Sequence, residues 1–131
     1  LPYHSVCTTS THDMTPLRNW WKEDPEKTQR YYNHVLQRIG EAPDECTAEI
    51  VAQIISNHLK TRSMLTIIPL QDWFAMDDSI KRKDIESERI NVPANSTHYW
   101  RYRMHITLEQ LLQADNLNNK IVSLIKEAGR K

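Results

Sequence analysis

Apolar residues recur at helical spacing over two long stretches of the chain. The first stretch lies between Pro25 and Gly40 and predicts a helix that begins at the proline and ends at the glycine. Its apolar stripe consists of Tyr31, Tyr32, Val35, Leu36 and Ile39. The second stretch follows Thr47, whose hydroxyl can cap a helix. The buried stripe of that second helix would be Val51, Ile54, Ile55 and Leu59.

Shorter helical segments are expected at three other places. A proline opens each of the first two, which run from Pro16 to about Trp21 and from Pro69 to about Met76. Near the end of the sequence, Thr107 has the spacing of a capping box with a glutamine three residues later. A terminal helical region should therefore begin there, with apolar positions at Leu108, Leu111, Leu112, Ile121, Val122, Leu124 and Ile125.

Two short apolar runs have the composition of β-strands. Residues 5–8 form the first run, and residues 64–68 form the second, which Pro69 closes. An apolar strand without polar alternation is typical of a parallel strand that is covered on both faces. The elements follow one another as strand, helices, strand, helices. We therefore expect an α/β fold that is predominantly helical, with two short parallel strands.

The length of the chain limits what this fold can be. At 131 residues the sequence corresponds to one domain, well short of the ~250 residues of a complete eight-stranded β/α barrel. Two parallel strands alone leave their edges and one apolar face uncovered. The sequence also begins without an initiator methionine. We therefore expect a slice of a larger fold, which would self-associate through its uncovered surfaces when isolated.

The charge and cysteine content argue against several classes of partner. Seventeen Lys and Arg residues balance seventeen Asp and Glu residues, so the formal net charge is zero. Such a chain has no electrostatic attraction to nucleic acid or to an anionic membrane surface, and no apolar run reaches the ~18 residues of a membrane span. Cys7 and Cys46 match no metal-binding spacing. We expect a cytoplasmic protein with reduced thiols, no metal and no cofactor.

Polar side chains follow directly after both predicted strands. His12 and Asp13 come after the first strand, and Gln71 and Asp72 come after the second. Because β/α barrels place catalytic groups at this end of their strands, all four residues are candidate site residues. A simpler interpretation stays open for the two aspartates: Asp13 could cap the helix opened by Pro16, and Asp72 could satisfy backbone donors of the short helix that it begins.

A third polar stretch combines Asn91 with the aromatic and basic run Tyr99-Trp100-Arg101-Tyr102-Arg103. Aromatic rings can cover the apolar faces of a sugar, while amides and carboxylates bind its hydroxyl groups. The same run also fits a plain strand, because Trp100 and Tyr102 alternate as on one buried face. Composition alone therefore leaves a sugar site and a buried strand both open.

Three blocks of sequence, taken together, resemble one enzyme family. The blocks are THDMTPLRNWW at residues 11–21, IIPLQDWFAMDD at residues 67–78 and RINVPANSTHYWRYRMHITLEQLL at residues 89–112. In that order they closely resemble the end of the 4-alpha-glucanotransferases, the amylomaltases and disproportionating enzymes of glycoside hydrolase family 77. Ala94 and the Tyr-Trp-Arg-Tyr run resemble the long, multidomain branch of this family, which carries starch-binding modules upstream.

The resemblance implies a fold and a reaction. The family's catalytic domain is an elaborated (β/α)8 barrel, so residues 1–131 would be the C-terminal two β/α units of that barrel. Val6–Thr8 would lie on the seventh strand and Leu65–Ile68 on the eighth. The implied reaction transfers α-1,4-glucan segments between maltooligosaccharides, or to glucose, by a retaining double displacement that needs no cofactor.

The resemblance also implies roles for individual residues. His12 and Asp13 match the family's His-Asp motif, whose carboxylate is the third catalytic acid and holds hydroxyls of the transferred sugar. Gln71, Asp72 and Asn91 are the candidates for substrate contact.

The two groups that a retaining mechanism needs most are not matched in this sequence. The family's nucleophile and general acid/base stand on earlier strands, N-terminal to Leu1, so we expect the isolated chain to be inactive. The acidic residues of 77–88 match no motif, and we interpret them as solvated.

Two other classes of protein compete with this interpretation. A non-catalytic helical interaction module would leave the polar groups after the two strands far apart and exposed. A nucleic-acid binder would use the run at residues 99–103 as a stacking platform, although the zero net charge argues against it.

Overall fold

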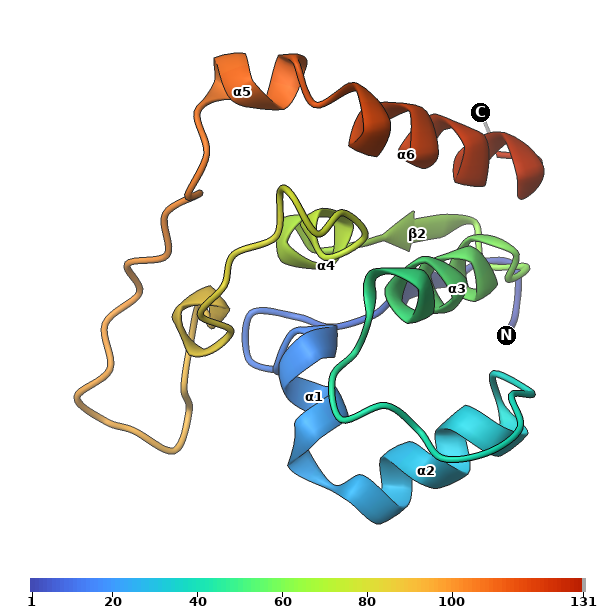
Figure 1. Ribbon diagram of the computed structural model, residues 1–131, viewed down its shortest axis with the longest axis horizontal. Helices are drawn as coiled ribbons and strands as arrows, with labels where there is room; N and C mark the ends of the chain where they lie inside the picture. The colour runs from blue at the N-terminus through green and yellow to red at the C-terminus, as the bar shows by residue number, and fades with distance from the viewer. Residues whose placement is uncertain (131) are drawn as a thin grey trace.

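The computed structural model describes residues 1–130, which form six α-helices, one short 3₁₀ helix and two strands (Figure 1). In chain order these are β1 (Val6–Thr8), α1 (Leu17–Glu23), α2 (Pro25–His34), α3 (Ala48–Leu59), β2 (Leu65–Ile67), α4 (Leu70–Phe74), the 3₁₀ helix η1 (Glu86–Glu88), α5 (Leu108–Leu112) and α6 (Asp115–Glu127). The expectation of a predominantly helical chain with two short strands is confirmed.

The two strands pair in parallel, as their order in the sequence predicted. Val6 lies opposite Leu65 and Thr8 lies opposite Ile67. A further hydrogen bond runs from the Leu65 backbone N–H to the Ser5 carbonyl oxygen (3.3 Å). Because the strands run in the same direction, the segments that follow them leave from the same edge of the sheet.

The sheet is covered on one face and open on the other. Side chains alternate between the faces of a strand, so Cys7 points to one face and is buried there. Val6, Leu65 and Ile67 share the opposite face, where Ile67 keeps 58% of its surface exposed. The described residues thus leave one apolar face open, as expected for two parallel strands by themselves. Coverage of the second strand on both faces stays a prediction for a larger fold.

The hydrophobic core is centred on α3. Figure 1 shows α6 along one side of α3 and β2, with α1 and α2 on the other side. The stripe predicted for this helix is confirmed, since every one of its members is buried. The neighbouring elements add Leu17, Trp21, Leu36, Phe74, Met76 and Leu117 to the core.

The second helix ends earlier than its apolar pattern predicted. α2 stops at His34 rather than at Gly40, and Gln37 then takes a left-handed backbone conformation with φ +55°. The Asn33 side-chain amide donates to the Gly40 carbonyl oxygen (3.2 Å), which folds the loop back onto the helix. Ile39, expected in the apolar stripe, is 98% exposed. A local side-chain hydrogen bond thus stabilises the turn before the glycine is reached.

The predicted capping residues act as expected. The Thr47 hydroxyl accepts a hydrogen bond from the Ile50 backbone N–H (3.3 Å) at the start of α3. Thr107 and Gln110 form a complete capping box at the start of α5. The predicted terminal helical region is confirmed, and it divides into α5 and α6.

Between α4 and α5 the chain is mostly irregular. In Figure 1 the part of this segment that follows η1 extends away from the helices and returns at α5. Trp100 lies in it with 62% of its surface exposed, so the run at residues 99–103 is not a buried strand.

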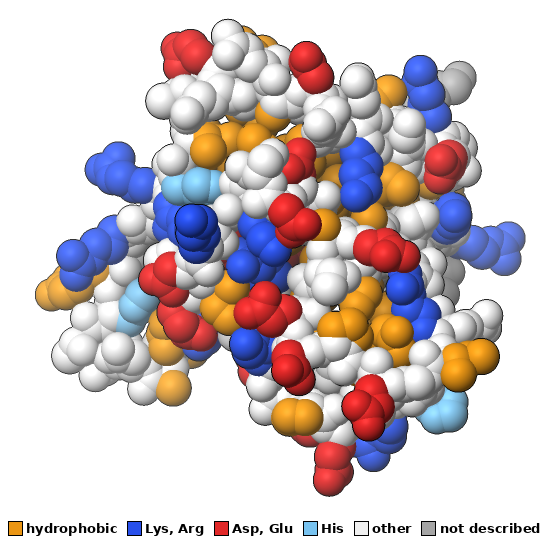
Figure 2. All heavy atoms as spheres, viewed as in Figure 1, with side chains coloured by type: hydrophobic (Ala, Val, Ile, Leu, Met, Phe, Trp, Pro, Cys, Tyr) orange, Lys and Arg blue, Asp and Glu red, His pale blue; other side chains and the backbone are white. Residues whose placement is uncertain are grey.

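The surface mixes charge and apolar patches. Figure 2 shows acidic and basic side chains interspersed over the viewed face, with hydrophobic patches between them. Within residues 1–130, none of the helices combines the length and the apolar character that crossing a membrane requires.

Candidate active site

The loops that follow β1 and β2 meet at one end of the sheet. The Thr9 hydroxyl, just after β1, donates to the Asp72 carboxylate after β2 at 2.5 Å. His12 and Gln71 line the same pocket, whose volume is about 200 Å³. The expectation that the two polar groups lie together is therefore confirmed, contrary to what a helical interaction module would require.

Two side chains contact the Asp13 carboxylate. The Asn91 amide nitrogen Nδ2 donates to Oδ1 at 2.6 Å, and the His12 nitrogen Nε2 lies 3.3 Å from Oδ2. The side chains of His12 and Asp13 are about half exposed, so the carboxylate can still accept hydrogen bonds from a ligand. Pro16 is the N-cap residue of α1, and the side chain that accepts from the first backbone N–H of that helix, Leu17, belongs to Asp72 and not to Asp13, so the capping interpretation of Asp13 is wrong.

An aromatic ring from the irregular segment lies against this loop. The ring centroids of Trp100 and His12 are 5.0 Å apart, with the two planes inclined by 50°. This contact brings residues from two distant parts of the sequence to one place. It also leaves much of the indole surface open, as stacking on a sugar would need.

Asp72 is held inside the fold. Its side chain is 1% exposed, and while one oxygen accepts from Thr9, the other accepts from the Leu17 backbone N–H at 2.9 Å. Burial raises the pKa of the Asp72 carboxyl, and these two hydrogen bonds act in the opposite direction. Asp72 therefore satisfies a donor at the start of α1 and not at the start of α4, the helix that contains it, so the interpretation that it caps its own helix is wrong. Its contact with substrate stays a prediction.

Gln71 is also buried, but it borders the pocket. Its amide nitrogen donates to the Glu88 carbonyl oxygen at 3.0 Å. This bond joins α4 to η1. The predicted contact between Gln71 and substrate is not tested by any contact among the described residues, and it stays a prediction.

Glu88 corrects our interpretation of the acidic segment. We expected the acidic residues of 77–88 to be solvated, yet Glu88 is only 2% exposed. The Arg18 nitrogen Nη1 lies 3.7 Å from its carboxylate oxygen Oε2, and both side chains are buried. Burial raises the pKa of Glu88 to about 7, although the nearby Arg18 acts in the opposite direction. The sequence did carry a weak signal, because Arg18 lies inside the first of the three blocks.

Two pockets lie next to these residues. The first, beside His12, is lined by Ser10, Thr11, His12, Met14, Pro16, Ile67, Pro69, Gln71, Glu88 and Ile90. The second has a volume of about 390 Å³ and lies within the irregular segment. Its lining consists of Glu86, Ser87, Arg89, Asn95, Thr97, His98, Tyr99, Arg101 and Tyr102.

We next consider the residues that could bind a metal ion and the two cysteine thiols. Among residues 1–130, no group of three or more His, Cys, Asp or Glu side chains is placed to hold a metal ion. Cys7 and Cys46 are both free and buried. Burial raises the pKa of the Cys46 thiol to about 12, so this thiol stays protonated and is a poor nucleophile.

Comparison with known proteins places most of the chain within one family. The family described as 4-alpha-glucanotransferase, glycoside hydrolase family 77, matches residues 1–109. This match includes all five residues that the sequence singled out after the strands and in the irregular segment.

Two curated relatives carry the same description. The 4-alpha-glucanotransferase DPE2 of Oryza sativa subsp. japonica is 39% identical over 128 residues, which is 98% of this chain and 14% of the rice protein. The 4-alpha-glucanotransferase of Chlamydia trachomatis serovar D is 31% identical over 123 residues, which is 92% of this chain and 22% of that protein. The chain thus spans less than a quarter of the length of either relative.

One solved structure has a similar fold. The amylomaltase from Streptococcus agalactiae, determined in complex with acarbose, matches 99% of this chain and 23% of its own length. The TM-score is 0.72 at 18% sequence identity, which shows similarity of fold.

Proposed function

Because the chain belongs to the 4-alpha-glucanotransferases of glycoside hydrolase family 77, we propose that it acts as one part of a longer enzyme of this family. The enzyme would transfer α-1,4-glucan segments from one maltooligosaccharide to another, or to glucose. The observation that carries the proposal is the Asp13 carboxylate, which the fold holds between Asn91 and His12 while leaving it open to a ligand.

The open face of the sheet supports a place inside a larger barrel. Val6, Leu65 and Ile67 are apolar and exposed on one face, whereas strands of a β/α barrel are covered on both faces. We assign β1 and β2 to the seventh and eighth strands of the (β/α)8 barrel, and α1 to α6 to its last two β/α units. The preceding strands of the enzyme would then cover this face.

In this enzyme Asp13 would bind hydroxyl groups of the sugar that is transferred. Glycosyl transfer passes through a transition state that resembles an oxocarbenium ion, and hydrogen bonds to ring hydroxyls that strengthen there supply several kcal/mol. Asn91 and His12 fix the direction in which the carboxylate oxygens point. A group held in this way needs little reorganisation when the transition state forms.

The displacement itself requires two further carboxylates that the rest of the enzyme would supply. In a retaining mechanism one carboxylate attacks the anomeric carbon while the other protonates the leaving oxygen, with the two groups about 5–5.5 Å apart. The second group then deprotonates the acceptor hydroxyl, which attacks the glycosyl-enzyme and releases the first carboxylate. With a sugar acceptor the result is a new α-1,4 bond rather than hydrolysis.

The residues around Asp13 are suited to a glucan. Trp100 offers an exposed aromatic surface beside His12, and Asn91 offers a side-chain amide. The Streptococcus agalactiae amylomaltase with the similar fold was determined with acarbose bound. We propose maltooligosaccharides as the substrates and glucose as an acceptor, with Gln71 among the residues near the bound sugar.

The test uses the longer enzyme that carries this chain. In steady-state release of glucose from maltotriose, Asp13→Asn should lower kcat by about a hundredfold or more, since an interaction made mainly in the transition state is lost. KM should change far less. Asp44→Asn is the matched control, because Asp44 is exposed in the turn before α3. A near-normal kcat for Asp13→Asn would remove Asp13 from the catalytic machinery.

A further inference from the structure

Arg18 and Glu88 form a charged contact at a buried position. Their side chains are 9% and 2% exposed, and the nitrogen and oxygen lie 3.7 Å apart. This distance is a charge contact rather than a hydrogen bond. Within the described residues, Oε2 of Glu88 has no hydrogen-bond partner. Burying two such groups removes their hydration, and apolar residues of similar volume are often at least as stabilising.

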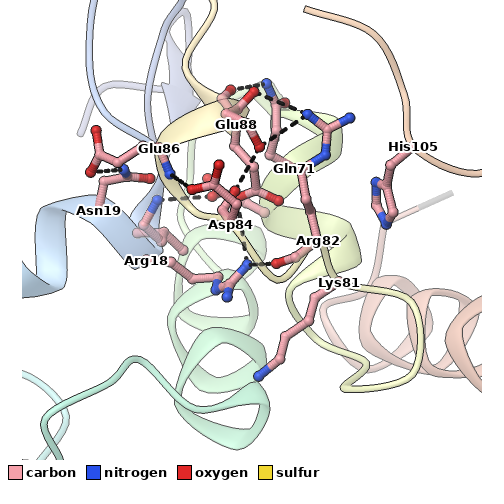
Figure 3. Close-up of polar contacts among 12 residues, drawn as sticks. Arg18, Asn19, Gln71, Lys81, Arg82, Asp84, Glu86, Glu88 and His105 are labelled. Atoms are coloured by element: carbon pink, nitrogen blue, oxygen red, sulfur yellow. Dashed lines mark hydrogen bonds and ion pairs between the residues drawn. The ribbon is translucent and has the colours of Figure 1, made fainter.

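The contact belongs to a set of tethers that hold η1 against α1 and α4. Arg18 also donates from Nη1 to the Arg82 carbonyl oxygen at 2.6 Å. Asn19, the next residue of α1, donates to the Glu86 carboxylate at 3.2 Å. Gln71 donates to the backbone carbonyl of Glu88. Figure 3 shows Arg18, Asn19 and Gln71 directed towards the segment that carries Glu86 and Glu88.

The segment that carries Glu86 and Glu88 leads directly to Asn91, which contacts Asp13. Asn91 stands three positions after Glu88, a stretch that spans at most ~10 Å when fully extended. Its amide makes the 2.6 Å hydrogen bond to Asp13. Within this stretch, the Ile90 carbonyl oxygen is also held in place, because the His98 nitrogen Nε2 lies 3.0 Å from it. A displacement of the Glu88 backbone would therefore also displace Asn91, because only two residues separate them.

We propose that Arg18 and Glu88 are positioning residues, whose buried contact fixes the backbone that enters Asn91 and so aligns the Asn91 amide with Asp13. This inference rests on the proposed function of Asp13. It assigns the Arg18–Glu88 pair a role in the geometry of the site rather than in stability, which explains why polar side chains occupy a place where apolar side chains would pack.

The test compares three variants of the longer enzyme. The double replacement Arg18→Met with Glu88→Met fills the same space without charge and should lower kcat for maltotriose on the order of tenfold, with KM and the thermal unfolding midpoint little changed. Glu88→Gln keeps a polar group next to Arg18 and should recover most of that kcat. The control is Arg38→Met with Glu49→Met, because Arg38 and Glu49 form another Arg–Glu contact (3.1 Å), between the α2–α3 loop and α3.

A coupling measurement separates positioning from a general structural effect. If the pair acts through Asn91, the double replacement should change kcat by less than about twofold in an Asn91→Ala background. An equal loss in both backgrounds would overturn the proposal. So would an unchanged kcat in the double replacement, or a loss of kcat that follows a loss of thermal stability.

A readout without activity tells failure of this inference from failure of the proposed function. In the ¹⁵N-labelled 131-residue chain, the side-chain amide resonances of Asn91 report its hydrogen bond to Asp13. The double replacement should shift these resonances in the same direction as Asp13→Ala does. Unshifted resonances would overturn the positioning role and leave the proposed function standing. Absence of glucan transfer by the wild-type enzyme would overturn the proposed function, and the resonances would still decide whether the pair positions Asn91.

Discussion

The side-chain amide of Asn91 donates a hydrogen bond to Asp13 across 78 positions of the sequence, at 2.6 Å. The two residues come from the irregular segment and from the loop after β1. Their contact means that the candidate active site is assembled from both halves of the chain. The carboxylate after the first strand is oriented by a residue that follows the second.

Replacing Asn91 should impair turnover in two distinguishable ways. In the longer enzyme, Asn91→Ala removes the donor and should lower kcat about tenfold or more. Asn91→Asp places a second carboxylate against Asp13, so repulsion between like charges should lower kcat further at neutral pH, with partial recovery at lower pH as the pair takes up a proton. The kcat–pH profiles of both variants check this. Asn116→Asp is the control, because the Asn116 side chain is exposed on α6. A flat profile for Asn91→Asp would contradict the contact.

Replacing Asp72 should destabilise the chain. Asp72→Ala leaves the Thr9 hydroxyl and the Leu17 N–H without their acceptor inside the fold, which should cost about 2–4 kcal/mol of the free energy of unfolding. Urea unfolding of the variant against Asp44→Ala measures the loss. A variant as stable as the control, but with a raised KM in the longer enzyme, would instead show that Asp72 contacts the substrate.

The 131-residue chain by itself should not release glucose from maltotriose. Asp13 can stabilise a developing charge, but without a nucleophile no glycosyl-enzyme forms, and without a general acid the oxygen is a poor leaving group. The measurement is glucose release over hours at high concentration of the chain, with the longer enzyme as the positive control. Sustained turnover by the chain would show that it carries a complete catalytic centre.

The free energy of unfolding of the chain should fall as the pH rises from about 4.5 towards 7, because the buried Glu88 carboxyl ionises over this interval. Burial raises the pKa of this carboxyl from 4.5 to about 7 in the folded chain, so the folded state holds a proton that the unfolded state releases. The contribution is fully present below pH 4.5 and is lost as the pH passes 7. A rise from 4.5 to about 7 is about 2.5 pKa units, so at ~1.4 kcal/mol per unit the loss is on the order of 3 kcal/mol.

The difference between wild type and Glu88→Gln isolates this effect. Urea unfolding at several pH values should show the wild type losing stability relative to the variant across that interval. Parallel stability curves for the two proteins would show that Glu88 titrates normally in the folded chain.

The open face of the sheet should make the isolated chain associate with itself. Exposed apolar strands are sites of association, and Ile67 lies on this face with more than half of its surface exposed. Ile67→Lys should shift the chain towards the monomer in light scattering over a concentration series. Ile39→Lys is the matched control, because Ile39 is fully exposed in a loop. A wild-type chain that stays monomeric at high concentration would contradict the prediction.

Features set by local pattern could be predicted from the sequence. The stripe of α3 and its Thr47 cap follow from spacing within a few turns, and both are confirmed. The end of α2 could not be predicted in the same way. It depends on the Asn33 amide reaching the Gly40 carbonyl, a contact that competes with helical hydrogen bonds in a manner that apolar spacing does not reveal.

The candidate site also has features that the sequence predicted and features that it did not. Parallel strands bring their following loops to one edge, so the meeting of His12 with Gln71 could be expected. Whether a polar residue after a strand faces the pocket or the protein interior could not be predicted from the sequence. Asp72 turns inwards to α1, and Glu88 is buried because α1 and α4 close over it. Both outcomes depend on packing between distant segments.

The parallel register of β1 and β2 has a consequence for the order of folding. Val6 pairs with Leu65, 59 positions later (65 − 6), and closing a loop of that length costs entropy that three-residue strands repay only partly. α3 forms from contacts within a dozen residues and supplies five of the fourteen buried residues of the core. The helix should therefore form first and bring the strands together late. In native-state hydrogen exchange the amides of β1 and β2 would then open more readily than those of α3, and the loop that carries Asp13 would be the last part of the molecule to settle.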